Sequence, residues 1–168
     1  MTSITFKGDP VQIIGELPRV GNTAPDFTLT AGDLLDKRLS DFSGKIKILS
    51  IVPSLDTPVC AISVKRFNQE ITSLDNIVLI NISADLPFAQ TRFCEANDVS
   101  RAETLSTMRS PSFGKDYGVT ITEGPLAGLL SRAVVVLDQE NRIMYSEHVP
   151  DIAQEPDYEK VLVAVKAI

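Results

Sequence analysis

Two continuous apolar runs dominate the pattern of hydrophobic and polar positions along the chain. They cover residues 46–52 and 77–82, and in the first run only Lys47 and Ser50 interrupt the apolar character. A strand with one wet face would alternate between apolar and polar residues, whereas runs of this kind are typical of strands buried on both faces of a sheet. We therefore expect two central strands.

The segment between these two runs has the periodicity of a helix. Its apolar residues recur at steps of three and four: Val64, Phe67, Ile71 and Leu74. Polar residues fill the intervening positions, so the segment has one apolar stripe and one wet face. The order strand, helix, strand predicts a βαβ unit in which the two strands run parallel.

Shorter patterns in the N-terminal third predict three further features. Residues 4–6 and 11–14 flank a Gly-Asp turn and predict a β-hairpin, so we treat residues 1–16 as an N-terminal hairpin extension and residues 17–168 as the main domain. Residues 27–30 alternate and predict a short strand. Residues 33–43 are polar with spaced leucines and are expected to form a loop and turn.

Four elements are expected after the second central strand. Residues 83–85 are predicted to cap a helix whose apolar edge is formed by Phe88, Thr91 and Phe93. The remaining expectations are a short strand at 104–108, one or two helical turns at 111–117, an antiparallel hairpin of 131–137 with 142–148, and a closing helix at 156–167. A βαβ unit joined to a ββα unit predicts an α/β thioredoxin-like fold, with a mixed central sheet flanked by helices.

A cysteine lies in the first turn of the predicted central helix. Pro58 suits the first helical position, where its missing N–H costs no hydrogen bond, and Thr57 suits the N-cap. This phasing puts Cys60 at the third helical position, where unpaired amides and the positive end of the helix dipole favour an anion. A thiolate is such an anion, so Cys60 is a candidate nucleophile.

Composition and charge exclude several classes of protein. With 168 residues, 43% of them hydrophobic, the chain fits one domain with a substantial core. A net charge of -6 argues against a partner nucleic acid. No apolar run approaches the roughly 20 residues of a membrane span, and the N-terminus lacks the pattern of a secretory signal, so we expect a cytoplasmic protein. Its two cysteines, Cys60 and Cys94, are then expected to be free or redox-active thiols.

The residues around both cysteines resemble a known family. Pro53, Thr57 and Cys60 match the Pro-x-x-x-Thr-x-x-Cys motif of the peroxiredoxins. The resemblance covers essentially the whole chain and is most specific to the bacterial thiol peroxidase subfamily, the atypical two-cysteine type. The segments that carry it are 63–69, 82–90, 92–94 and 132–136.

The resemblance implies a role for each of five residues. Cys60 matches the peroxidatic cysteine and Cys94 the resolving cysteine on the following helix. Thr57 matches the hydroxyl that orients peroxide and thiolate, Arg132 the arginine that a later strand brings to the site, and Pro53 the proline that shields the sulfur.

The resemblance also implies a reaction. Hydrogen peroxide and organic hydroperoxides would be reduced to water and alcohols through a sulfenic acid on Cys60 and a Cys60–Cys94 disulfide, as a protection against oxidative stress. An external dithiol, thioredoxin in this family, would reduce the disulfide, with no metal or other cofactor, in a homodimer. A disulfide needs Cα atoms within about 7 Å, and we expect the reduced form to hold the sulfurs too far apart. The first turn at Cys60, the Cys94 helix or both would then unwind.

Other interpretations of the sequence stay open. A thiol-disulfide oxidoreductase usually has Cys-x-x-Cys at the start of this helix, but Thr57 occupies the first cysteine position. A non-enzymatic redox sensor could use the same two cysteines to switch a surface. His148, the single histidine, could form a Cys-His pair, and Arg92 could also reach the site or a partner.

Overall fold

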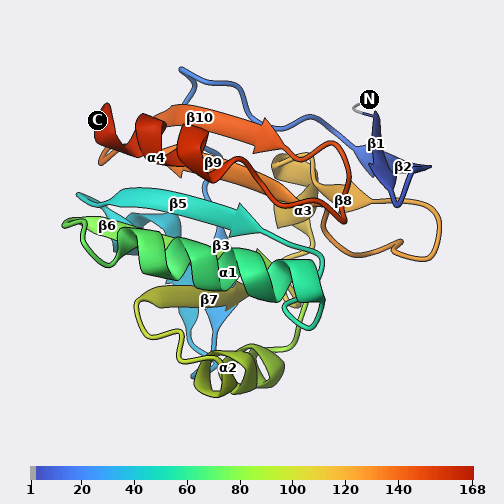
Figure 1. Ribbon diagram of the computed structural model, residues 1–168, viewed down its shortest axis with the longest axis horizontal. Coiled ribbons are helices and arrows are strands. Elements are labelled where there is room, and N and C mark those ends of the chain that lie inside the picture. Colours follow the sequence, from blue (N-terminus) through green and yellow to red (C-terminus); the bar gives the residue numbers. More distant parts are fainter. Residues whose placement is uncertain (1–2) are drawn as a thin grey trace.

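The computed structural model describes residues 3–168, which form a seven-stranded mixed sheet with helices on both faces and a smaller three-stranded sheet beside it (Figure 1). The strand order of the large sheet is β10-β9-β5-β6-β7-β3-β4. Its strands are β3 (Thr28–Ala31), β4 (Asp36–Arg38), β5 (Ile46–Ile51), β6 (Ile77–Ser83), β7 (Ala102–Ser106), β9 (Ala133–Leu137) and β10 (Ile143–His148). The thioredoxin-like fold expected from the sequence is confirmed.

The two apolar runs form the centre of the sheet. β5 and β6 are parallel, with Ile46 opposite Ile77, and all six residues of β5 are buried. Lys47 is buried with them because its ammonium group reaches the turn between β9 and β10, where it donates to Asn141 Oδ1 (2.6 Å) and to the carbonyl of Asp138 (3.1 Å). The predicted βαβ unit is confirmed, and the one buried lysine has acceptors for its charge.

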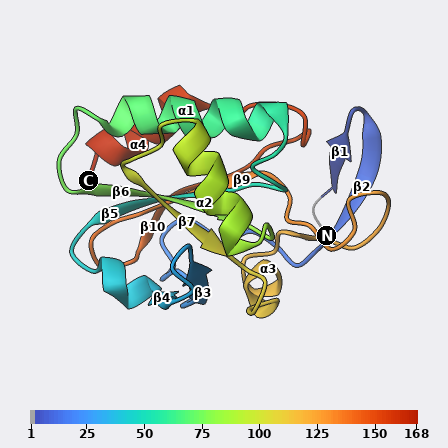
Figure 2. The same cartoon turned by 90° about the horizontal axis from the view of Figure 1, so that it is seen from below.

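Helices cover the two faces of the sheet (Figure 2). The helices are α1 (Pro58–Ile71), α2 (Pro87–Ala96), α3 (Ser112–Asp116) and α4 (Tyr158–Lys166), with a 3-10 turn, η1 (Leu39–Phe42). α1 and α4 lie on one face, where Phe67 and Val161 belong to one buried cluster. α2 packs on the same side, since its Phe93 shares a cluster with Val64 of α1. No helix within residues 3–168 is long and apolar enough to cross a membrane.

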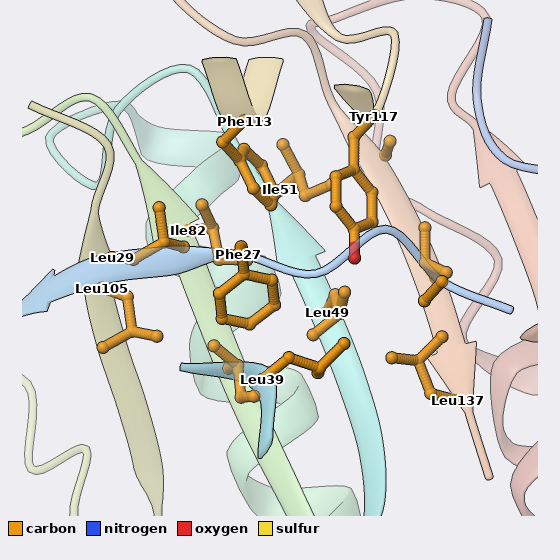
Figure 3. Close-up of a cluster of buried hydrophobic side chains, with 14 of the residues drawn as sticks. Phe27, Leu29, Leu39, Leu49, Ile51, Ile82, Leu105, Phe113, Tyr117 and Leu137 are labelled. Atoms are coloured by element: carbon orange, nitrogen blue, oxygen red, sulfur yellow. The ribbon is translucent and has the colours of Figure 1, made fainter. Parts of the chain in front are cut away.

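The opposite face carries the larger apolar cluster. Phe113 and Tyr117 stack at 4.5 Å between ring centroids, and Phe27 meets Phe113 edge to face (Figure 3). They pack on Leu49 and Ile82 of the central strands. The two clusters pack against opposite faces of β5 and β6. The end of β5, where the chain turns toward Cys60, is therefore held by a close-packed core.

The N-terminal hairpin forms its own small sheet beside the large one. β1 (Ser3–Phe6) pairs with β2 (Asp9–Ile14), as predicted, and β2 pairs with β8 (Thr120–Ile121), which the sequence did not predict. β8 has two residues, too few to give a periodic signal. Thr5 exchanges backbone hydrogen bonds with Pro150 and Ile152, which tie the hairpin to the loop after β10. The division at residues 16 and 17 stays a prediction.

Three details of the prediction are wrong. The loop expected at 33–43 contains β4 and η1, because Leu39 and Phe42 turn inward to complete the core. The N-cap of α2 is Leu86, not a residue of 83–85, because the carboxylate of Asp85 is bonded to another segment. Phe88 is 67% exposed and Thr91 is exposed too, so only Phe93 of the apolar edge predicted for α2 is buried.

Candidate active site

Cys60 lies where the sequence predicts it, in the first turn of α1. Pro58 is the first helical residue, and Thr57 is the N-cap, whose Oγ1 accepts the amide of Cys60 at 3.4 Å. The same hydroxyl donates to the carbonyl of Ser54 at 3.1 Å. Thr57 therefore fixes both the start of the helix and the loop ahead of it. Cys60 lies in the first turn, where main-chain amides lack acceptors within the helix.

The sulfur of Cys60 faces a buried guanidinium group. Arg132 Nη2 donates to Cys60 Sγ at 3.1 Å, and the two residues are 2% and 0% exposed. The sheet explains the contact, because β9 is antiparallel to β5 and its Ala133 lies opposite Ile51. The residue before β9 is thereby brought beside the residues that follow β5, although 72 positions separate Arg132 from Cys60.

Arg132 is held in place from its other side. Its Nε donates to the carbonyl of Ile152 at 2.9 Å, and the amide of Ile152 donates to the carbonyl of Thr5. Nη1 is buried and has no hydrogen-bond partner in the part of the chain that the structure describes. A buried donor on a permanently charged group that lacks an acceptor is costly. Nη1 is therefore available for an oxygen of a bound molecule.

A pocket of about 330 Å³ adjoins these residues. Pro53, Thr57 and Arg132, three of the five site residues expected from the sequence, are part of its wall. The rest of the wall is mainly apolar. It comes from the loop ahead of α1 and the first turn of α1, the hairpin, the loop before β9 and the loop after β10: Phe6, Lys7, Ser54, Pro58, Val59, Leu126, Leu129, Ile152 and Ala153. The pocket can hold a small polar head beside Arg132 and an apolar tail against the hairpin.

Cys94 lies apart from this group, in α2. Both cysteines are free, and Cys94 is half-buried, with its thiol donating to Thr104 Oγ1 over 3.9 Å. Burial, and secondarily the charge of Glu95, raise the pKa of the Cys94 thiol above its ordinary value, although the bond to Thr104 opposes the shift. The Cys94 thiol therefore remains protonated near neutral pH, which suits the second thiol of a reaction better than the first nucleophile.

Two other candidates do not join the site. His148 Nε2 lies 2.7 Å from Ser131 Oγ, so the Cys-His pair is not formed. Burial lowers the pKa of His148 to about 4, which leaves the ring neutral near pH 7. Arg92 is exposed on α2, in a groove that it lines with Asp56, and makes no hydrogen bond to Cys60. Within residues 3–168, no three His, Cys, Asp or Glu side chains gather as a metal site.

Sequence reasoning missed part of the surroundings of Cys60. Phe6 and Lys7 were assigned to a peripheral hairpin, yet they line the pocket. Ile152 supplies a main-chain oxygen, which leaves no signature in a sequence. Asp85 was interpreted as a helix cap, but it binds the loop ahead of Cys60. Among these residues, only Asp85 has a side chain whose chemistry could have pointed to a role near Cys60, since a carboxylate can accept several hydrogen bonds.

Comparison with known proteins agrees with this geometry. The Redoxin family model matches residues 19–162. A protein named thiol peroxidase from Oceanobacillus iheyensis is 51% identical over 162 residues, covering 96% of this chain and 97% of that protein. A thiol peroxidase from Streptococcus sanguinis is 51% identical over 164 residues, 98% of this chain and 99% of the other. The chain belongs to the thiol peroxidase family of redoxins.

A solved structure extends the comparison to the fold of this thiol peroxidase family member. The crystal structure of a peroxiredoxin-like protein from Aquifex aeolicus superposes with a TM-score of 0.93 at 37% sequence identity, covering 99% of this chain and 97% of that chain. Coverage of this extent includes the N-terminal hairpin, which precedes the segment that the Redoxin model matches.

Proposed function

We propose that this thiol peroxidase family member reduces hydrogen peroxide and organic hydroperoxides with Cys60 as the attacking thiolate and Cys94 as the second thiol. The observation that carries the assignment is the Cys60 sulfur, which is 3.1 Å from Arg132 Nη2 while Nη1 of the same side chain has no partner among the described residues. Nη2 holds the attacking sulfur, and Nη1 is free to bind the peroxide oxygen that the sulfur attacks.

The first step is displacement at oxygen. The thiolate of Cys60 attacks one peroxide oxygen, a sulfur–oxygen bond forms, and the oxygen–oxygen bond breaks with its electron pair on the departing oxygen. That oxygen takes a proton from water and leaves as water or an alcohol, and Cys60 becomes a sulfenic acid. Arg132 stabilises negative charge as it moves from sulfur to oxygen, and Thr57 supplies a hydroxyl at the pocket wall.

The second step joins the two cysteines. The thiol of Cys94 attacks the sulfenic acid of Cys60, the disulfide forms, and the oxygen leaves as water. An external dithiol then reduces the disulfide by exchange, and the thioredoxin-type reductant general for this family is the proposed partner. The electrons come from thiols and end on peroxide oxygens, so the proposed cycle needs no metal or organic cofactor.

Exposed apolar side chains beside the loop ahead of Cys60 support a proposed protein contact there, either with a second copy in a homodimer or with the reductant. Leu86 and Phe88 are 56% and 67% exposed beside the groove formed with Asp56, a residue of the loop ahead of Cys60. Exposed large apolar side chains often mark protein contacts. A cytoplasmic setting, where cysteines stay reduced between turnovers, completes the proposal.

Turnover with three variants tests this function. Peroxide-dependent NADPH consumption is measured with thioredoxin and thioredoxin reductase for the wild type, Cys60→Ser and Cys94→Ser. We expect the wild type to turn over, Cys60→Ser to be inactive, and Cys94→Ser to consume about one peroxide per chain under this scheme before stalling.

Two results contradict the proposal. Activity retained by Cys60→Ser would show that another group attacks the peroxide. A wild type that oxidises once and is never reduced again, with fresh thioredoxin present, would favour the redox sensor over the enzyme.

A further inference from the structure

Asp85 connects the two cysteine-bearing segments, although it belongs to neither α1 nor the pocket. It lies in the connection from β6 to α2, two residues before Pro87. Its carboxylate accepts three hydrogen bonds, from Ser54 Oγ (2.6 Å), the amide of Leu55 (2.8 Å) and Ser83 Oγ (2.7 Å). Two of these donors belong to the loop that leads from β5 to Cys60.

Further hydrogen bonds within the loop connect Ser54 to Cys60. The carbonyl of Ser54 accepts Thr57 Oγ1, and Thr57 Oγ1 in turn accepts the amide of Cys60. Ser54 Oγ also accepts the amide of Asp56 at 3.2 Å. A chain of hydrogen bonds therefore runs from Asp85 through Ser54 and Thr57 to the first turn of α1.

Asp85 is itself fixed to the sheet. Ser106 Oγ on β7 donates to its carbonyl, and the amide of Thr107 donates to the carbonyl of Ser83 at 3.0 Å. The carboxylate is thus an anchor for the loop at 54–57.

The two cysteine sulfurs are not bonded to each other, and each has a hydrogen-bond partner of its own. Cys60 bonds to Arg132 beside β9, and Cys94 bonds to Thr104 on β7. Both cysteines nevertheless belong to one apolar cluster, in which Cys94 packs against the group that contains Cys60, Phe93 and Val99. Disulfide formation needs one cysteine-bearing segment, or both, to move.

We propose that Asp85 is a positioning residue that holds the loop ahead of Cys60 for attack on peroxide and must release that loop before Cys94 reaches the sulfenic acid. This inference rests on the proposed function. The carboxylate then acts with opposite sign on two steps. It speeds formation of the sulfenic acid by keeping Thr57 and Cys60 in place, and it slows closure of the disulfide.

A slow closure leaves the sulfenic acid exposed to a second oxidation. A further hydroperoxide can transfer one oxygen to the sulfenic acid, which gives a sulfinic acid and water or an alcohol. Asp85 therefore has a second effect, since the same contact that slows the disulfide raises the fraction of sulfinic acid formed at a given peroxide concentration.

Asp85→Asn tests the inference, because the amide keeps the shape of the side chain but offers one acceptor oxygen in place of two. Stopped-flow oxidation of the Cys94→Ser background measures attack on hydrogen peroxide, the second phase in the presence of Cys94 measures disulfide formation, and mass spectrometry measures sulfinic acid. Loss of charge-assisted hydrogen bonds of this kind changes each rate by about tenfold. We expect slower attack, faster disulfide formation and less sulfinic acid.

Ser54→Ala removes a donor from the opposite side of the same contact and is expected to shift all three readouts in the same directions. It also carries the test if Asp85→Asn does not fold. Asp41→Asn is the matched control, since the Asp41 carboxylate accepts the amide of Arg38 at 2.7 Å at the start of η1, which is part of neither the loop at 54–57 nor α2. It should leave the three readouts unchanged.

Two patterns would overturn the inference. Unchanged rates would show that the contact does not position the loop, and a slowing of both steps together would show that Asp85 supports the fold alone. A wild type that forms no Cys60–Cys94 disulfide would instead contradict the proposed function.

Discussion

At the scale of single residues, the site depends on where Arg132 puts its nitrogens. Nε is committed to the carbonyl of Ile152, Nη2 to Cys60 Sγ, and Nη1 has no partner among the described residues. A lysine offers a point charge without a planar fork and cannot make the first two contacts together while leaving a third donor free.

Arg132→Lys is therefore expected to lower kcat/KM for hydrogen peroxide by about 10²- to 10³-fold, the loss typical of one preorganised donor. Stopped-flow measurement of sulfenic acid formation at limiting peroxide checks this rate. Arg142→Lys is the matched control, since Arg142 is exposed next to β10, and it should react like the wild type. A loss below tenfold for Arg132→Lys would remove Arg132 from the reaction.

The sequence alone could have led to some of these residues but not to others. Thr57, Pro58 and Cys60 form a helix start that local chemistry explains, and the structure has that start at the predicted positions. Arg132 was chosen from the family resemblance, because the pairing of β9 with β5 that brings it to Cys60 is not a local property. Ile152 contributes a carbonyl oxygen, which every residue has, so its identity carried no signal.

At the scale of elements, the hairpin of β1 and β2 does more than extend the chain. Phe6 and Lys7 form part of the pocket wall, and Thr5 holds the amide of Ile152, whose carbonyl holds Arg132. The two short β runs around a Gly-Asp turn predicted the hairpin. This local signal contained nothing about the loop after β10, with which the hairpin pairs, because that contact spans most of the chain.

Phe6→Ala should therefore separate substrates by size. We expect KM for a bulky organic hydroperoxide such as cumene hydroperoxide to rise about fivefold, since part of an aromatic side chain's apolar contact is lost. Hydrogen peroxide has no tail to contact Phe6, so its kcat/KM should stay within about twofold of wild type. Steady-state kinetics with both substrates checks the prediction, with Phe6→Leu as the conservative control. Equal losses for both substrates would show a general disturbance of Arg132 instead.

At the scale of the whole molecule, protonation of His148 is linked to stability. Burial lowers its pKa to about 4 in the folded protein, against about 6.5 in an unfolded chain. Between these two values the unfolded chain binds more protons, so the free energy of unfolding falls as the pH falls. Asp151 acts in a different window, because its pKa is lowered to about 2, chiefly by the hydrogen bond from Thr5. Its stabilisation is present above about pH 3.8, the ordinary pKa of the group, and is lost as the pH falls through the folded value.

His148→Gln is expected to flatten the dependence of stability on pH between about 6.5 and 4, removing up to about 3 kcal/mol of the fall in that window. Urea denaturation at a series of pH values measures the effect. Asp151→Asn, as the comparison, should alter the profile only below about pH 4. A profile for His148→Gln that runs parallel to the wild type would mean that His148 is not buried as a neutral ring in solution.

The sequence by itself determined the elements whose cause is local. The buried strands β5 and β6, the amphipathic α1, the Thr57 cap and the phase of Cys60 follow from apolar periodicity and from the chemistry of a helix start. The tertiary structure alone decided which distant groups support the site. Arg132 contacts Cys60 through the pairing of β9 with β5, the hairpin supports Arg132 through the loop after β10, and Asp85 holds the loop ahead of Cys60 at Ser54. The reason is physical, since a helix or strand is fixed by neighbours a few residues away, whereas these contacts depend on the order of strands in a sheet.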